Sequence, residues 1–135
     1  MLYPMATQNR RLERRMDVVD WLKKNFSVTR VVDISSYEDM GKYLEGTGSI
    51  VFDHTSTTAF ACSSVRTDKE VLEKLCAEIG YSSVVVEARD SNGRSIYHTN
   101  VFMSIATDFV VVCMDAVHKQ EEKKHMEDSF KESGK

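Results

Sequence analysis

Residues 49–88 read SIVFDHTSTTAFACSSVRTDKEVLEKLCAEIGYSSVVVEA, and three structural patterns follow one another in them. Ser49–Asp53 and Thr58–Ser63 are rich in β-branched and aromatic residues and flank a short polar linker, which predicts a β-hairpin. Val71–Ile79 carries apolar residues at helical spacing, and Ser83–Ala88 then predicts another strand. The order of hairpin, helix and strand predicts a ββαβ unit of an α/β protein.

Both ends of the helix in this unit carry recognisable signals. Thr67-Asp68-Lys69-Glu70 matches a capping box, in which the Thr67 side-chain oxygen accepts a hydrogen bond from the Glu70 backbone and Glu70 reaches back. Gly80 follows the apolar stripe and is a favoured residue at the end of a helix. We therefore expect the helix to lie between these signals.

Fewer strands are predicted before this unit than within it. Apolar residues at helical spacing predict an amphipathic helix over about residues 9–25. Val28–Ile34 reads as a β-branched strand, and the polar stretch Ser36–Tyr43 is suited to a short helical turn. Compared with the central unit, the opening region therefore lacks half of its hairpin.

The chain after the central unit repeats its order in part. Asp90-Ser91-Asn92-Gly93 predicts a tight turn, and Ile96–Ile105 with Phe109–Met114 predicts a second hairpin. A charged helix follows from about Ala116 to Lys131, and we expect the tail of residues 116–135 to be frayed. A second group of hairpin and helix thus follows the first.

The predicted helices begin near residues 9, 67 and 116, a spacing of about 50 residues that is typical of stacked or propeller-like units. Each such unit has an apolar face that a neighbouring unit must cover. Residues 1–135 are therefore expected to form a single partial domain that begins and ends inside a unit, as part of a larger protein. Uncovered strand edges and apolar faces also predict self-association.

Composition excludes several classes of protein. The chain has 135 residues with 18 basic and 21 acidic side chains, and its formal net charge of -3 gives no electrostatic reason to expect nucleic acid or a membrane surface as a partner. Its apolar runs are far shorter than the ~20 residues that span a bilayer. Three cysteines without a CxxC motif favour a reducing, cytoplasmic compartment.

No cofactor is expected. The chain contains neither a GxGxxG nor a GxxxxGK[ST] motif, so nucleotide cofactors have no support. His118, Glu122 and His125 can share a helical face, but they lack HExxH spacing and a fourth ligand, so no metal site is predicted either.

Three polar residues stand out as candidates for a site. Glu45 lies beside glycines before a predicted strand, where backbone can approach a ligand and a carboxylate can bind a cation. His98 follows a turn, and strand alternation places it on one side with Asn100, where the pair could orient a substrate and transfer a proton. Arg66 precedes the capped helix and could pair with an anion. Taken singly, they could equally be a solvated turn acid, a half-buried histidine and a surface arginine.

Four segments of the chain together resemble one family. They are LYPM-x3-NRRLERR (Leu2–Arg15), YLEGTGSIVFD (Tyr43–Asp53), SVRTD (Ser64–Asp68) and IYHTNVFM (Ile96–Met103). In these blocks the chain is similar to the guanidino-group-modifying (pentein) superfamily, and most of all to its arginine deiminase-related, amidinotransferase-like branch. The resemblance implies a five-bladed α/β propeller of ββαβ units around a central active site, of which this chain would hold about two to three blades.

The resemblance also implies a role for each candidate residue. In the family a cysteine thiolate attacks the carbon of a guanidino compound, and water or an amine then completes hydrolysis or amidino transfer. Glu45 matches the carboxylate that binds the guanidinium nitrogens, and His98 matches the general acid and base. Arg66 matches a residue that meets the substrate carboxylate, and Asn100 stands where some relatives have a second guanidinium-binding aspartate. Because an amide brings no negative charge, free arginine as the substrate is left open.

The nucleophilic cysteine of the family has no match here, since it lies near the end of a longer chain. Cys62 and Cys113 lie in predicted apolar strands and Cys76 lies on an apolar helix stripe, which are ordinary core positions. We therefore expect a partial, inactive chain of a guanidino-modifying enzyme, either a deiminase or an amidinotransferase. The alternatives are a non-catalytic guanidino-binding or interaction protein derived from the fold, and an interaction module that uses the arginines of residues 10–15.

Overall fold

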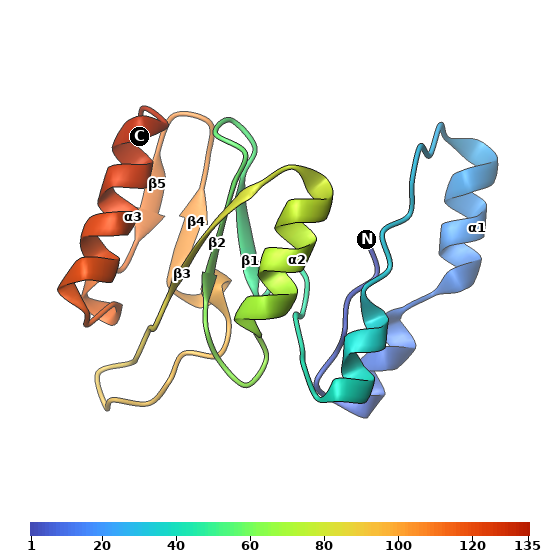
Figure 1. Ribbon diagram of the computed structural model, residues 1–135, viewed down its shortest axis with the longest axis horizontal. Helices are drawn as coiled ribbons and strands as arrows, with labels where there is room; N and C mark the ends of the chain where they lie inside the picture. The colour runs from blue at the N-terminus through green and yellow to red at the C-terminus, as the bar shows by residue number, and fades with distance from the viewer.

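The computed structural model describes residues 1–135 as a mixed α/β fold built around a three-stranded sheet (Figure 1). The sheet has the order β1–β2–β3, with β1 at Ile50–Asp53, β2 at Thr58–Cys62 and β3 at Ser82–Val86. β1 and β2 are antiparallel, so the predicted hairpin is confirmed, and β2 and β3 are parallel. Because α2 (Lys69–Ile79) connects β2 to β3, the predicted ββαβ unit is present.

The sheet is covered on both faces, which explains why every residue of the central strand β2 is buried. Ala59 and Ala61 belong to the apolar cluster that contains Leu72 of α2. Phe60 points the other way and packs in the cluster of α3 (Gln120–Glu132), where its ring centroid lies 5.1 Å from that of Phe130. Figure 1 accordingly shows α2 and α3 on opposite sides of the sheet.

The start of α2 differs from the prediction by one residue. Asp68, not Thr67, caps the helix, because its side chain accepts a hydrogen bond from the helix backbone at 3.1 Å. Thr67 is buried, its hydroxyl has no partner, and Glu70 pairs with Lys42 instead of reaching back. The predicted capping box is therefore wrong, and aspartate, which is an equally strong cap, takes the role. Gly80 ends the helix with φ at 76°, as predicted.

The second predicted hairpin is shorter than expected. Its strands are β4 (Met103–Ile105) and β5 (Val110–Val112), which pair antiparallel in a separate two-stranded sheet. The strand predicted from Ile96 is wrong, because Thr99–Val101 forms a short 3₁₀ helix, η3, whose buried Thr99 side chain is hydrogen-bonded to the central unit. The two sheets remain separate and do not close into a barrel.

The C-terminal helix begins later than predicted. A 3₁₀ helix, η4 (Met114–Ala116), precedes α3, whose large apolar side chains are buried against the sheet. The end of the chain makes one buried contact, and the fraying predicted for the tail stays a prediction. Nζ of Lys135 donates to Oδ2 of Asp53 at 2.8 Å, and both side chains are almost fully buried.

Residues 1–40, here called the N-terminal arm, depart most from the prediction. The single helix predicted over residues 9–25 is divided into a 3₁₀ helix, η1 (Gln8–Glu13), and α1 (Met16–Asn25). The predicted short helical turn is present as η2 (Ser35–Met40).

The departures in the N-terminal arm have local causes. Arg14 leaves the helical region with ψ at 83°, and its guanidinium pairs with the nearly buried carboxylate of Glu38, which interrupts the helix between η1 and α1. The strand predicted over Val28–Ile34 is also wrong, since a single bridge between Leu2 and Asp33 is the only pairing there. The β-branched residues of this stretch have no neighbouring strand along which to pair.

None of the residues of α1 is buried, and Figure 1 shows this helix set apart from the rest of the molecule. Its Trp21 is exposed over 56% of its surface, and the Trp21 ring centroid lies 5.6 Å from that of Phe26. The apolar stripe that predicts the helix is therefore only loosely covered. Like the other helices, α1 is not long and apolar enough to cross a membrane.

Candidate active site

Glu45 and His98 meet in space although 53 positions separate them in the chain. Nε2 of His98 lies 2.9 Å from Oε2 of Glu45, and the two side chains are exposed over only 13% and 1% of their surfaces. Arg66 reaches the same oxygen, with Nη1 at 3.3 Å. The other carboxylate oxygen, Oε1, accepts a hydrogen bond from the backbone of Ala6 at 3.0 Å. Three distant segments therefore converge on one buried carboxylate.

The surroundings of Glu45 favour its charged form. Burial alone would raise the pKa of this carboxyl group. The hydrogen bonds from Ala6 and His98 and the positive charge of Arg66 outweigh burial and hold the pKa of Glu45 below its usual value. Glu45 is therefore ionised near neutral pH, as a residue that binds a cation must be.

The turn that carries Glu45 depends on two glycines. Gly46 has φ at 57°, in the region that favours glycine, and an added Cβ would lie 3.3 Å from the ring of Tyr3. At Gly48 an added Cβ would lie 2.8 Å from the ring of His98, which is closer than such contacts allow. The glycine at position 48 therefore makes room for the imidazole.

Two buried hydroxyl groups hold these segments together. The Ser49 hydroxyl accepts a hydrogen bond from the backbone of Glu45 and donates to the backbone carbonyl of Arg66, each at 2.9 Å. The Thr99 hydroxyl accepts from the backbone of Cys62 at 2.8 Å and donates to the Ser49 carbonyl. Because Thr99 follows His98 directly, these bonds position the imidazole against the carboxylate.

Arg66 lies between the carboxylate and an aromatic ring. Its Cζ is 5.2 Å from the centroid of the Tyr97 ring, within the range of a cation–π interaction. The Ser64 hydroxyl accepts from the backbone of Arg66 and donates to the carbonyl of Tyr97, so the two residues share an anchor. The Arg66 side chain is 29% exposed and is the most open of the three charged or titratable side chains at the site. Its observed partner is Glu45, whereas the family resemblance implies a carboxylate of the substrate.

Asn100 is placed apart from the other candidates. It is exposed, and its backbone N–H donates to the carbonyl of Gly48 at 3.3 Å. The predicted alternation that puts His98 and Asn100 on one strand face is wrong, because the η3 helix replaces the strand there. The structure therefore brings together three of the four predicted site residues, and the role predicted for Asn100 stays a prediction.

The three cysteines differ in burial. Cys62 and Cys76 are buried, and burial raises the pKa of both thiols, that of Cys76 to about 11. A raised pKa keeps a thiol protonated near neutral pH. Cys113 is exposed, so its predicted core position is wrong, because β5 ends one residue before it. No three His, Cys, Asp or Glu side chains lie together as a metal site.

The sequence interpretation did not identify several residues of the site. Tyr97, Thr99 and Ser49 are common residue types with no motif spacing of their own. Their only signal is that they lie beside Glu45 or His98 in the blocks that carry the family resemblance.

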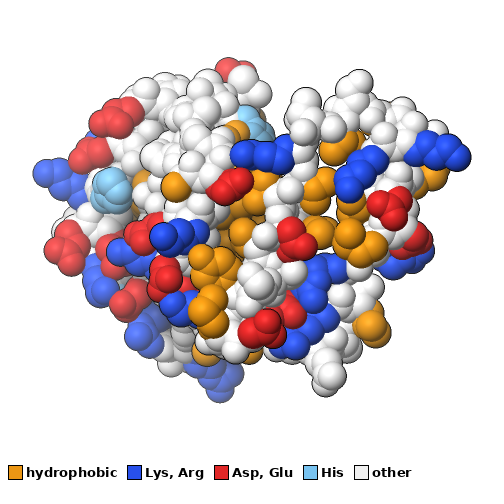
Figure 2. Space-filling view, turned by 45° about the vertical axis from the view of Figure 1, so that its right-hand side comes forward, with side chains coloured by type: hydrophobic (Ala, Val, Ile, Leu, Met, Phe, Trp, Pro, Cys, Tyr) orange, Lys and Arg blue, Asp and Glu red, His pale blue; other side chains and the backbone are white.

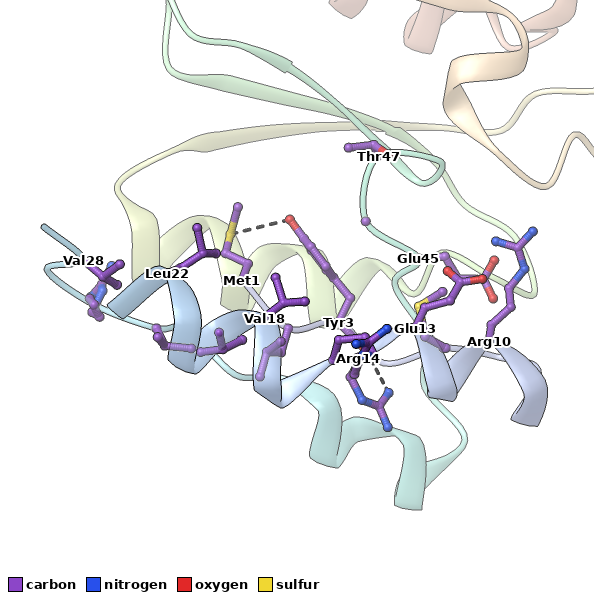
Figure 3. Close-up of a pocket in the computed structure, with 17 residues that line it drawn as sticks. Met1, Tyr3, Arg10, Glu13, Arg14, Val18, Leu22, Val28, Glu45 and Thr47 are labelled. Atoms are coloured by element: carbon purple, nitrogen blue, oxygen red, sulfur yellow. Dashed lines mark hydrogen bonds between the residues drawn. The ribbon is translucent and has the colours of Figure 1, made fainter. Parts of the chain in front are cut away.

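A groove of about 580 Å³ opens beside Glu45, between α1 and the first residues of the chain. Figure 3 shows Glu45 with Arg10 and Glu13 at one end of the groove and Leu22 and Val28 toward the other. Figure 2 shows hydrophobic side chains gathered in a hollow between two parts of the molecule. Glu45 is the one residue that this groove shares with the candidate site, since neither His98 nor Arg66 lines it, and Arg30 adds a charge among its apolar residues.

The fold and the site together define the class of protein. A mixed α/β chain in which a buried carboxylate binds a histidine and a guanidinium fits the guanidino-modifying pentein superfamily and its arginine deiminase-related branch, so the resemblance seen in the sequence is confirmed. A family model described as "N,N dimethylarginine dimethylhydrolase, eukaryotic" matches residues 1–135, and the chain belongs to this family. No curated protein and no solved structure matches the chain significantly.

Proposed function

We propose that this chain supplies the guanidinium-binding and acid–base residues of a hydrolase that acts on C–N bonds of guanidino compounds. The observation that carries the proposal is the Glu45 carboxylate, which holds a guanidinium, that of Arg66, beside the imidazole of His98. A carboxylate that binds a planar cation fixes the plane of the cation, so a nucleophile can approach the central carbon from one face. Membership of the dimethylarginine dimethylhydrolase family supports hydrolysis as the reaction.

The proposed reaction has two steps. A thiolate adds to the guanidinium carbon, and the C–N bond to the leaving amine breaks as His98 donates a proton to that amine. Water then adds to the carbon of the covalent adduct and gives a proton to His98, and the C–S bond breaks to return the thiolate and release a ureido product. His98 therefore serves as the acid of the first step and the base of the second. An amine in place of water would give amidino transfer.

The thiolate is proposed to come from a cysteine other than Cys62, Cys76 and Cys113. Support comes from the burial and raised pKa of the first two thiols, and from the lack of any hydrogen bond between Cys113 and Glu45 or His98. We therefore expect residues 1–135 by themselves to bind a guanidino compound without hydrolysing it. The same observation favours the alternative function, which is a non-catalytic guanidino-binding or interaction protein derived from this fold.

Arg66 and Asn100 are proposed to bind the substrate. If the partly exposed Arg66 side chain leaves Glu45, its guanidinium is free to meet a substrate carboxylate, as the family resemblance implies. Asn100 is exposed on the η3 helix just after His98, where its amide oxygen can accept a hydrogen bond from a cation.

The ββαβ unit and the group formed by β4, β5 and α3 are proposed to be blades of an α/β propeller, with the N-terminal arm as part of a third. Support comes from the shared order of hairpin and helix in the two groups. A neighbouring blade or a second copy of the chain would then cover apolar side chains such as Trp21 and Phe26. Three free cysteines favour a reducing, cytoplasmic setting.

Titration with N,N-dimethylarginine tests the proposal. Calorimetry should give saturable binding for the wild-type chain, and Glu45→Gln should weaken it by about tenfold or more, because the variant lacks the charge that binds the cation. Glu87→Gln is the matched control, since Glu87 is an exposed acid paired with Lys119 away from the site. Equal affinities for the two variants would contradict the proposal.

A further inference from the structure

The Glu45 carboxylate has no side open for a ligand. Oε1 accepts from the backbone of Ala6, and Oε2 accepts from both His98 and Arg66. The side chain is exposed over only 1% of its surface. A guanidino ligand that binds this carboxylate must therefore replace one of the groups already there.

The exposure of these groups indicates which one can be replaced. The backbone of Ala6 cannot leave without moving the chain, and His98 is only 13% exposed and fits against Gly48. The Arg66 side chain is 29% exposed, and a single hydrogen bond of 3.3 Å joins it to the carboxylate. Arg66 is also chemically a guanidinium, so its position marks where a ligand guanidinium would lie.

We propose that the guanidinium of Arg66 occupies the ligand subsite in the free protein, that a guanidino ligand binds by displacing it, and that the Tyr97 ring is the aromatic wall of this subsite. The proposal rests on the proposed function, because it assumes that Glu45 is the guanidinium-binding carboxylate. It adds a specificity-determining residue, Tyr97, and an internal competitor for the site, Arg66.

The geometry around Tyr97 supports its assignment. Its ring centroid lies 5.2 Å from Cζ of Arg66 and 4.8 Å from the centroid of the His98 ring. Tyr97 is 50% exposed, and the Ser64 hydroxyl anchors its backbone carbonyl, so the residue can remain in place when Arg66 moves away. The negative face of an aromatic ring attracts a delocalised cation, so the wall favours a guanidinium over a neutral group.

Methylguanidinium chloride at millimolar concentration is the probe for displacement. Arg66→Met removes the guanidinium that competes for Glu45. The affinity for methylguanidinium should therefore rise by about tenfold, because the site is no longer occupied in the free protein. Arg30→Met is the matched control, because Arg30 pairs with Glu78 at 3.2 Å on the exposed surface, and it should leave the affinity unchanged. In the wild-type chain, NMR signals of the Arg66 side chain should lose the ring-current shift from Tyr97 as the probe binds.

Tyr97 is tested in the Arg66→Met background. Tyr97→Leu should lower the affinity for methylguanidinium by about fivefold, and Tyr97→Phe should restore it, because phenylalanine keeps the aromatic face. If Arg66→Met binds methylguanidinium no more tightly than wild type does, and Glu45→Gln abolishes binding, the displacement proposal is overturned. The proposed function is not contradicted by that result. Unchanged binding by Glu45→Gln would overturn both.

Discussion

α1 and α2 have similar amphipathic patterns, but only α2 is buried. α2 packs Leu72 and Leu75 against the sheet, whereas α1 has no buried residue and exposes Trp21. The difference lies in what covers each stripe, since the sheet lies under α2 and a groove lies beside α1. Most of the stability of a protein helix comes from packing of its apolar face. The pattern therefore predicts a helix, and the stability of that helix depends on its partner.

Leucine substitutions on the two helices should show the greatest difference. Leu72→Ala removes a fully buried side chain and should lower the free energy of unfolding by about 3 kcal/mol. Leu22→Ala, at a side chain that is 39% exposed, should lower it by less than about 1 kcal/mol. Urea unfolding followed by circular dichroism measures both losses. Equal losses would show that α1 is packed as well as α2.

Loss of Glu38 should loosen the N-terminal arm without affecting the sheet. Its carboxylate pairs with Arg11 and Arg14 and accepts from the backbone of Met5, so Glu38→Ala should destabilise the arm by about 2 kcal/mol. Hydrogen exchange should become faster within residues 1–40 and stay unchanged in β2. Asp39→Ala is the control, at an exposed neighbouring acid. Faster exchange throughout the chain would mean that the arm and the sheet unfold as one unit.

The buried ion pair of the sheet region should give a distinct acid dependence. Burial opposes the charge of Asp53, but hydrogen bonds from Lys135, Ser56 and the backbone of Thr55 lower its pKa from the usual 3.8 to about 2. A lowered pKa in the folded state contributes stability that is present above the unfolded pKa and is lost as the pH falls through the folded pKa.

Wild type should therefore lose about 2 kcal/mol relative to Asp53→Asn as the pH falls from 5 to 2. Chemical denaturation at a series of pH values measures this difference. Parallel pH profiles for the two proteins would show that the Asp53–Lys135 pair contributes nothing.

Gly48 joins the Glu45 turn to the histidine segment, and Gly48→Ala should disturb the site itself. The added Cβ would lie 2.8 Å from the His98 ring, and relieving such overpacking should cost about 2 kcal/mol. NMR shifts of the His98 ring should change as its contact with Glu45 is lost. Gly41→Ala is the control: Gly41 has φ at 66° and an added Cβ there meets no atom within 4 Å, so this variant strains the backbone without a collision. Unchanged His98 shifts in Gly48→Ala would contradict the close approach.

Helix capping should give the smallest effect and still distinguish the two helices. Asp68→Ala removes the cap of α2 and should cost about 1 kcal/mol, whereas α1 has no side-chain cap to lose at Arg15. Thr67→Val should be neutral or stabilising, since it replaces a buried hydroxyl that has no partner. Thermal unfolding measures both changes. A larger loss for Thr67→Val than for Asp68→Ala would restore the capping box predicted from the sequence.

The elements that the sequence predicts correctly depend on residues close together in the chain. The β1–β2 hairpin and the apolar stripe and C-terminal glycine of α2 are of this kind. The wrong predictions lie where a distant partner changes the local conformation. Arg14 interrupts a predicted helix because it pairs with Glu38, and Thr99 interrupts a predicted strand because it bonds to Ser49.

In the candidate site, too, the sequence predicts the local features and distant contacts decide the rest. The sequence alone identifies Glu45, His98 and Arg66 as candidates, because each lies in a short block of neighbouring residues that forms a motif. Their meeting, and the presence of an internal guanidinium on the Glu45 carboxylate, come from packing, since no local preference specifies a contact across 53 positions. The burial that keeps Glu45 nearly free of solvent depends likewise on how the turn, the N-terminal arm and the histidine segment close around it.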